Sequence, residues 1–395
     1  MDKRTAALVG ESIAHAAHDT WFGLAPVLMA SMSTDLALKN SDIGLALLLY
    51  NAVSSVTQPF FGRLAERVGG RVLAVSAICW TSLMFVGAIF APVRWVLLAM
   101  LALAGLGSGA FHPQGSANAT ASGGGRWGAT AASVFFFGGT LGASVTGSAL
   151  GGVLIDTWGR HSLVIVAFIT ISVALLVVRR LVPRELPDRE DGPAPAEHSL
   201  PRQGAGFYVP FGILLIGLAL RALTQNTISA YVPKFEQDLG VSAATYGLVL
   251  SAYLAFTAVG GVVGAYLADR VGFRVVLVVS LVLSAVVLYG YLALPGLWGY
   301  VCLVASGFLF GPSHTLYVVS GQRRFPGRMA TVAGFMLGFT FVSGSGGAWI
   351  MGLLGDARGL ETVLRALPVA LLISAVCGAI SVPGRRAATQ STDPS

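Results

Sequence analysis

The chain has 395 residues, of which 55% are apolar and only 11% are charged. A soluble domain carries about 25% charged residues, so this chain has too little charge to cover a water-facing surface. Its mean hydropathy of +0.75 excludes a soluble globular protein and indicates a protein that faces lipid over most of its area. The net charge of +7 does not indicate nucleic-acid binding, because membrane topology accounts for it.

Twelve apolar segments follow one another, each long enough to cross a bilayer as a helix of roughly 20 residues. The first segment also carries acidic and histidine residues, which a cleaved signal peptide lacks, so we expect a retained helix. The predicted fold class is an all-α membrane protein with twelve transmembrane helices and no separate soluble domain. The predicted spans are residues 8–32, 41–64, 72–91, 95–118, 127–155, 162–182, 208–233, 244–268, 274–294, 297–321, 328–355 and 362–382.

The basic residues divide unequally between alternate loops. If the N-terminus is cytoplasmic, 18 of the 25 Lys and Arg residues fall on the cytoplasmic side, 6 fall on the outer side, and Arg221 lies inside a span. An excess of this size follows the positive-inside rule. The sequence therefore predicts a multi-pass protein of the cell inner membrane with both termini in the cytoplasm.

The two halves of the chain repeat. SDIGLALLLYNA (41–52) matches ATYGLVLSAYLA (244–255), and LAERVGGR (64–71) matches LADRVGFR (267–274), both at a shift of 203 residues. Two pseudo-symmetric six-helix halves are typical of secondary transporters. The predicted domains are an N-terminal half over 1–182, a proline-rich cytoplasmic linker over 183–206, a C-terminal half over 207–384 and a cytoplasmic tail over 385–395.

A repeated motif lies between spans 2 and 3 and again between spans 8 and 9. GRLAERVGGR (62–71) and AYLADRVGFR (265–274) resemble the signature G-x-L-a-D-r-x-G-r-k/r of the major facilitator superfamily. The glycines permit a tight turn, and ion pairs of acidic with basic side chains can hold one conformation and release in another. The residues expected to act in gating are Gly62, Glu66, Arg67, Arg71, Asp269, Arg270 and Arg274.

A narrower resemblance involves spans 1, 4 and 5. HAAHDTWFGLAPVL (15–28), GSGAFHPQGS (107–116) and FFFGGTLGASVTG (135–147) resemble the fosmidomycin-resistance group of bacterial facilitators, which implies export of small molecules. Glycines at small-x-x-x-small spacing in span 5 predict close helix contacts. The span lacks the Gly-Pro pair found there in facilitator antiporters, so the direction of transport stays open.

Span 1 places ionisable residues inside the membrane, where they are costly and usually functional. Glu11, His15 and Asp19 lie four residues apart and share one helix face, with His18 beside them. Because His titrates near neutral pH and Asp19 lies near the predicted midplane, we expect Asp19, His18 and His15 to couple transport to protons. The alternative is a packed, hydrogen-bonded group that only joins helices. Two histidines at this spacing also suit a metal ion, but the sequence shows no third ligand, so no metal and no cofactor are expected.

Other polar residues lie in spans 2, 4, 7 and 10. Arg221 falls at the repeat position of His18, and an arginine facing a midplane cavity suits an anionic substrate. His112 and His314 lie 202 residues apart in stretches interrupted by Gly and Pro, which indicate binding sites in repeat transporters. The residues expected to bind substrate are His112, Arg221, Gln225, Asn226, His314 and Gln58.

The predicted function is secondary active transport by alternating access, and no enzymatic activity is expected. No phosphate-binding loop is present, so ATP is not expected to drive transport directly. One hypothesis is proton-coupled export of a small polar or drug-like molecule. The alternative is a proton symporter that imports a sugar, an organic anion or a metallophore-like solute. An intramembrane hydrolase built on Ser108 and His112 is not expected, since neighbours on one helix are more simply packing contacts. The expected partners are the small-molecule substrate, protons and the lipid bilayer, without nucleic acid, and the chain is expected to be a monomer.

Overall fold

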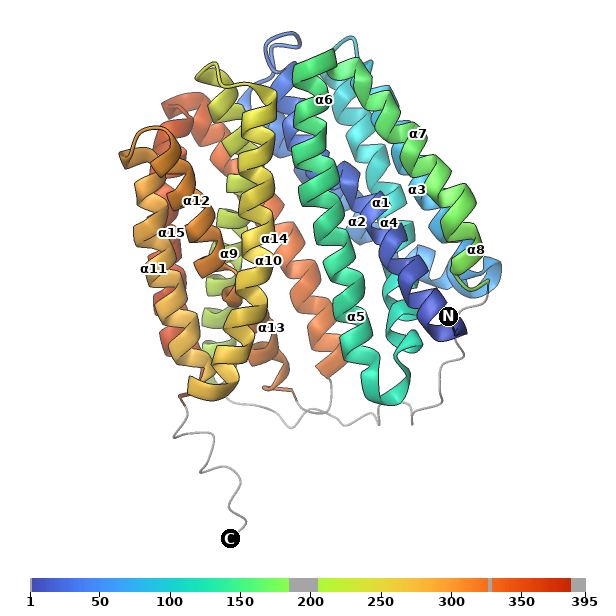
Figure 1. Cartoon of the computed structure of the whole chain (residues 1–395). Coiled ribbons are helices and arrows are strands. Elements are labelled where there is room, and N and C mark those ends of the chain that lie inside the picture. Colours follow the sequence, from blue (N-terminus) through green and yellow to red (C-terminus); the bar gives the residue numbers. More distant parts are fainter. Residues whose placement is uncertain (1, 185–204, 326–328, 385–395) are drawn as a thin grey trace. The chain divides into compact units, whose positions relative to one another are not determined.

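The computed structural model describes residues 2–184, 205–325 and 329–384 (Figure 1), and within this part of the chain every regular element is a helix. The linker predicted over 183–206 and the tail predicted over 385–395 fall almost wholly outside the described residues. The elements are α1 (Lys3–Met32), α2 (Asn40–Val68), α3 (Gly70–Ile89), α4 (Arg94–Ser122), α5 (Gly124–Leu141), η1 (Gly142–Leu150), α6 (Gly151–Trp158), η2 (Arg160–Leu163), α7 (Val164–Val173), η3 (Ala174–Val178), α8 (Arg179–Leu181), α9 (Ala205–Asp238), α10 (Ala243–Val271), α11 (Phe273–Ala293), α12 (Leu297–Phe310), α13 (Pro312–Gln322), α14 (Met329–Arg358) and α15 (Leu360–Ser381).

The predicted spans agree with these helices to within a few residues at most ends. Within the described residues, eleven helical stretches are long and apolar enough to cross a membrane. The twelfth, α1, has 30 residues but is not among the eleven, because its polar side chains lower its hydropathy. A helix of this length spans about 45 Å, which is enough to cross a bilayer. The expectation of an all-α membrane protein is confirmed.

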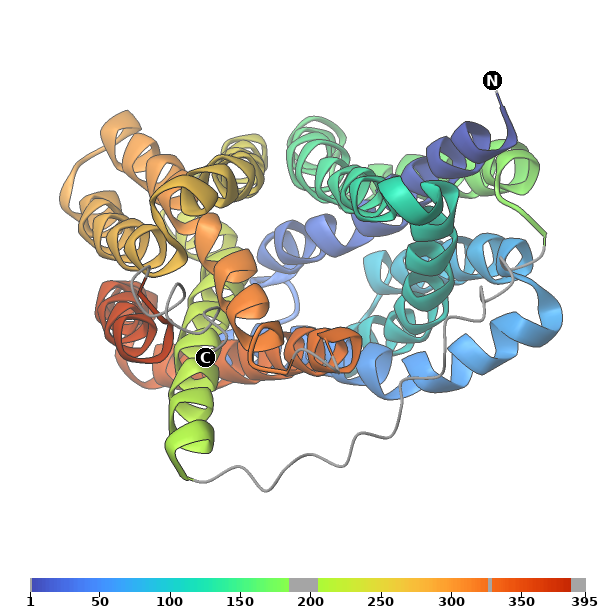
Figure 2. The same ribbon diagram turned by 90° about the horizontal axis from the view of Figure 1, so that it is seen from below.

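The chain divides into two compact units. Unit 1 comprises residues 1–188 together with Ser229–Leu254, and unit 2 comprises residues 189–228 together with 255–395. The end of α9 and the start of α10 therefore belong to unit 1, where the Tyr231 hydroxyl donates to the Asn40 carbonyl over 3.1 Å. Figure 2 looks along the helices, so that many of them are seen nearly end-on.

Glycines allow α1 to lie against α5 and η1. A Cβ atom at Gly142 would lie 2.1 Å from the Ala16 carbonyl oxygen, and one at Gly23 would lie 1.9 Å from the carbonyl oxygen of Ala143. Distances this short leave room only for hydrogen, so the two backbones are in direct contact. The expectation of close helix contacts in span 5 is confirmed. The chain widens to a π-helix over η1, a distortion that is often found at functional sites.

The sequence suggested a loop at the first copy of the repeated motif, but the structure shows helix over nearly all of it. Helix α2 continues to Val68 and α3 begins at Gly70, so that Gly69 alone separates them, at φ 89°. A Cβ atom there would also lie 2.2 Å from the Arg184 carbonyl oxygen. Both the dihedral angle and the contact explain the glycine.

The side chains of the motif were expected to form ion pairs in one conformation and to release them in another. None of the ion pairs found within the described residues involves Glu66 or Asp269. Arg71 instead donates through Nε to the Val182 carbonyl oxygen over 2.6 Å, which joins α3 to the end of the sixth span. In this arrangement Arg71 stabilises a helix C-terminus, whose last carbonyl groups have no partner within the helix.

We expect Gly142→Ala to destabilise unit 1, because the new methyl group must displace the α1 backbone. Overpacking of this kind costs about 1–3 kcal/mol, and the temperature midpoint of unfolding in detergent micelles should fall. The matched control is Gly212→Ala on α9, where a Cβ atom would meet nothing within 4 Å. That variant should unfold at or above the wild-type temperature, and an equal fall in both variants would contradict the packing assigned to Gly142.

Candidate functional site

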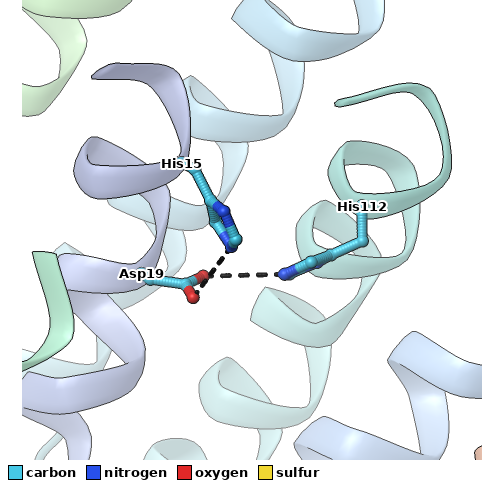
Figure 3. A group of neighbouring side chains, drawn as sticks. All are labelled: His15, Asp19 and His112. Atoms are coloured by element: carbon cyan, nitrogen blue, oxygen red, sulfur yellow. Dashed lines mark ion pairs between the residues drawn. The ribbon is translucent and has the colours of Figure 1, made fainter. Parts of the chain in front are cut away.

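Asp19 lies near the middle of α1, with its carboxylate turned toward α4 (Figure 3). Three histidines surround it, two from α1 and one from α4. The shortest contacts of the carboxylate oxygens are 3.1 Å to His15 Nε2, 2.9 Å to His18 Nδ1 and 3.7 Å to His112 Nε2. The structure therefore brings together all three residues that were predicted to couple protons, and adds His112 from a distant part of the sequence.

The backbone holds the His15 ring by its other nitrogen. Nδ1 of His15 lies 2.8 Å from the Phe135 carbonyl oxygen on α5, and because a carbonyl only accepts, the hydrogen-bond network places a hydrogen on Nδ1. In neutral imidazole, Nε2 then carries a lone pair, and this atom faces the carboxylate of Asp19. Two acceptors repel at 3.1 Å, so the contact is attractive only when one further proton is bound to Nε2 or to Asp19.

His112 repeats this arrangement from α4. Its Nδ1 lies 2.9 Å from the carbonyl oxygen of Ser108, which again leaves Nε2 with the lone pair in the neutral ring. Nε2 faces Asp19 at 3.7 Å. The side chain of Asp19 is 19% exposed and that of His112 is 28% exposed, whereas that of His15 is 3% exposed. A buried histidine therefore faces a carboxylate that remains partly accessible.

His18 plays a different part. It donates from Nδ1 to the carboxylate of Asp19, and its Nε2 lies 3.4 Å from the Thr81 hydroxyl of α3. A neutral His18 therefore has a partner at each nitrogen. Its ring stacks on Phe111 at a centroid distance of 5.0 Å, which fixes its orientation, so His18 orients Asp19 without needing an extra proton.

The ring of His15 is enclosed by α4 and α5. It stacks on Phe135 at a centroid distance of 4.0 Å and lies 5.2 Å from the ring of His112. A Cβ atom at Gly139 would come within 2.5 Å of Nε2, so glycine at this position leaves space for the ring. The small residues of span 5 thus serve the site as well as the helix contact.

The side chains of His15, Asp19 and His112 also offer three ligand atoms within 4.8 Å of one another. The sequence revealed no third ligand, and His112 supplies it. In a tetrahedral zinc site, ligand atoms at 2.0–2.1 Å from the metal lie roughly 3.4 Å apart, so this group would have to contract around an ion. The 3.1 Å contact of His15 with Asp19 is already a hydrogen-bond distance.

A second polar cluster lies in unit 2. Arg221 is buried at 6% exposure, and it donates from Nε to the Ser313 hydroxyl over 3.2 Å and from an Nη to the Gln225 side-chain oxygen over 2.9 Å. Its guanidinium lies over the ring of Phe310, 4.3 Å from the centroid. The cluster joins α9 to α12 and α13, on either side of the break at Gly311. A guanidinium held flat in this way suits recognition of a carboxylate or phosphate.

The remaining predicted binding residues are more dispersed. The side chain of Asn226 donates to the Ala222 carbonyl oxygen over 3.1 Å, a bond within its own helix. His314 is half-buried, and its Nδ1 has no hydrogen-bond partner within the described residues. Gln58 is half-buried on α2. In the part of the chain that the structure describes, no hydrogen bond joins these three residues to one another.

Sequence reasoning missed several residues that shape the two clusters. The carbonyl groups of Phe135 and Ser108 decide which histidine nitrogen carries hydrogen, and no side-chain pattern reports on a backbone group. Thr81 and Phe310 come from helices that do not carry the ionisable residues. Only Ser108 had a sequence signal, its position four residues before His112.

Comparisons with known proteins agree with this architecture. The profile of the Major Facilitator Superfamily matches residues 13–213 and 214–395. The "Fosmidomycin resistance protein" of Escherichia coli (strain K12) is 28% identical over 360 residues, which cover 90% of this chain and 87% of that protein. An uncharacterized MFS-type transporter of Bacillus subtilis (strain 168) is 26% identical over 90% of this chain and 88% of its own length.

A shorter match involves a differently named protein. The "Hexuronate transporter" of Escherichia coli (strain K12) is 30% identical over 152 residues, which cover 38% of this chain and 34% of that protein. This match spans too little of either chain to transfer a function, and it shows that related segments occur in transporters with other names.

Solved structures share the fold. A bacterial homolog of the human lysosomal transporter Spinster, in an inward-facing and occupied conformation, superimposes with a TM-score of 0.78 at 18% identity and covers 96% of this chain and 97% of that one. The nucleoside transporter NupG gives a TM-score of 0.72 at 14% identity, covering 96% and 98%. The chain is therefore a multi-pass membrane transporter that belongs to the Major Facilitator Superfamily, and it is not an enzyme.

Proposed function

We propose that this transporter exports a small polar or drug-like molecule in exchange for protons by alternating access. The membrane would be the cell inner membrane, with both termini in the cytoplasm, as the distribution of basic residues indicates. The likeness to the fosmidomycin resistance protein over 90% of the chain supports export. The transporter would act as a monomer, and it needs no cofactor.

The observation that carries the proposal is the 2.8 Å contact of His15 Nδ1 with the Phe135 carbonyl oxygen, which places a hydrogen on Nδ1. Because that hydrogen points to the Phe135 carbonyl, the contact between Nε2 and Asp19 requires one additional proton. With the proton bound, the pair is attractive; without it, a lone pair faces a carboxylate at 3.1 Å. Binding and release of one proton therefore change the forces on α1 at the α4 and α5 interfaces, which is how a proton gradient can bias a conformational equilibrium.

The proposed roles follow from this arrangement. Asp19 and His15 exchange the proton, and His18 orients Asp19. Substrate contacts are proposed for the accessible His112 and for Gln58 in unit 1. In unit 2 they are proposed for Arg221, Gln225, Asn226 and His314. Gating stays assigned to the repeated motif, namely Gly62, Glu66, Arg67, Arg71, Asp269, Arg270 and Arg274.

Import is the second candidate, because the same polar residues would serve either direction of transport. In that case the same proton site would drive symport of an organic anion. Direction separates the two: in inside-out vesicles, an acidic interior should drive accumulation of the substrate by an antiporter, and the same gradient should oppose accumulation by a symporter.

We expect Asp19→Asn to abolish proton-driven export. The amide cannot bind the exchangeable proton. Loss of a positioned proton-transfer group lowers the rate by roughly 100-fold or more. The measurement is growth of a bacterium without its main efflux pumps on a compound panel that includes fosmidomycin, with and without a protonophore. Wild-type resistance should disappear with the protonophore.

The control for this experiment is Asp156→Asn, which changes an exposed carboxylate at the end of α6. It should protect cells as the wild type does. Proton coupling through Asp19 would be excluded by full, protonophore-sensitive resistance in Asp19→Asn. If the wild type protects against none of the compounds, export of these compounds is excluded. Uptake of organic anions would then be measured instead.

Arg221→Gln should weaken export of anionic compounds and spare neutral ones. A charge-assisted hydrogen bond contributes about 1.5–3 kcal/mol, so the half-saturating concentration of an anionic compound should rise roughly tenfold or more. The measurement is initial export rate against concentration in proteoliposomes. Arg365→Gln, which changes an exposed arginine paired with Glu361, is the matched control, and equal effects on neutral and anionic compounds would contradict an anion contact.

A further inference from the structure

Glu11 is a second carboxyl group inside unit 1, and the proton cycle described above does not use it. It is fully buried on α1, between helices whose surfaces here are mostly apolar. Its Oε1 accepts a hydrogen bond of 2.6 Å from Asn118 Nδ2 on α4, and the same Nδ2 donates over 3.1 Å to Gln114 Oε1. Asn118 and Gln114 are 2% and 1% exposed, so all three side chains are buried.

Each of these three side chains keeps one polar atom without a partner. Within the described residues, Glu11 Oε2, Gln114 Nε2 and Asn118 Oδ1 are buried and make no hydrogen bond. A carboxyl group that served only to join two helices would be expected to have both oxygens bonded. Here the unused atoms are of opposite kinds: an amide N–H that can donate to a carboxylate, and an amide oxygen that can accept from a carboxylic acid.

The position of Glu11 relates it to the proton site. Glu11, His15 and Asp19 follow at intervals of one helical turn on the same face of α1. Helices α1 and α4 pack together in antiparallel register, since Glu11 meets Asn118 and Asp19 meets His112. Polar side chains therefore line the α1–α4 interface from the middle of α1 to its N-terminal end.

We propose that Glu11 is the proton-transfer group between the Asp19–His15 pair and the side of the membrane at which α1 begins. This inference rests on the proposed proton coupling and extends it with a route. In one transfer, the N–H or O–H bond of the Asp19–His15 pair breaks and an O–H bond forms at Glu11. The pair gains one negative charge and the Glu11 carboxylate becomes a neutral acid. Release of that proton towards the N-terminal end restores the carboxylate.

The local structure supports both states of this cycle. The carboxylate accepts from Asn118 Nδ2. The unpaired Gln114 Nε2 is a donor suited to the carboxylate, and the unpaired Asn118 Oδ1 is an acceptor suited to the acid. Charged groups on the neighbouring elements lie nearer the helix ends: Arg4 on α1 and Arg179 and Arg180 on α8 are exposed, and none forms an ion pair with Glu11 among the described residues. No fixed cation therefore holds Glu11 in its ionised form.

The first test measures the protonation of Glu11 directly and needs no substrate. Infrared difference spectra of the full-length protein in lipid, recorded as the pH is changed, report carboxylic acid groups by their C=O band. We expect a band that changes with pH in the wild type, is lost in Glu11→Gln and is retained in Asp19→Asn. A Glu11 band that stays constant over the whole pH range in which the protein is folded would overturn the proposal.

The second test separates proton transfer from packing. In proteoliposomes, with the panel compound that the wild type exports, Glu11→Gln should lower gradient-driven transport at least about tenfold. It should keep substrate exchange at equal pH, which requires no net proton release. Glu11→Asp should restore part of the driven rate. Equal loss of both activities, or wild-type driven transport in Glu11→Gln, would contradict the role.

A matched control and a second variant complete the design. Thr20→Val removes another buried polar group of α1 and should leave both activities near the wild type. Asp19→Asn distinguishes the two proposals. If this variant transports normally, the proposal that Asp19 couples transport to protons is wrong. If Asp19→Asn is inactive while Glu11→Gln transports normally, only the proposed proton route through Glu11 is contradicted.

Discussion

The contact between Asp19 and His15 is the interaction on which the rest of the site depends. A carboxylate inside the membrane is costly unless it is paired, and the three histidines around Asp19 meet that requirement only with the right number of protons. The carbonyl groups of Phe135 and Ser108 fix the hydrogens of His15 and His112. Under the proposed coupling, backbone geometry on α4 and α5 makes the charge of the cluster on α1 depend on one proton.

This geometry needs close helix packing. The glycines of α5 and η1 bring that segment against α1, and at Gly139 the missing side chain leaves the space occupied by the His15 ring. The stripe of small residues and the buried ionisable residues are therefore one feature. If α5 lay farther from α1, the Phe135 carbonyl could not reach His15, and the extra proton would no longer be required for an attractive contact.

Unit 2 carries polar chemistry of a different kind at the matching repeat position. His18 and Arg221 lie 203 residues apart, yet His18 donates to a carboxylate, whereas Arg221 is held by Ser313, Gln225 and the ring of Phe310. The two halves kept the helix pattern while the side chains diverged. This divergence fits a division of labour in which unit 1 handles protons and unit 2 contributes a cation for the substrate.

The sequence by itself determined the membrane class, the helices and the family, because apolar length and a repeat of 203 residues are properties of the chain that need no contacts. It also singled out His15, His18 and Asp19, since helical spacing places them on one side of α1. Only the tertiary structure showed that His112 completes the cluster, that backbone carbonyls set the histidine hydrogens, and that Glu11 has unpaired neighbours. The motif was expected to be a loop, but helices α2 and α3 extend through nearly all of it, and the expected tight turn lies at Gly69. The ion pairs expected of Glu66 in one conformation stay a prediction. The physical reason is common to these cases: hydrogen bonds between helices depend on how the helices pack, and spacing along one helix does not report which group of another helix lies opposite.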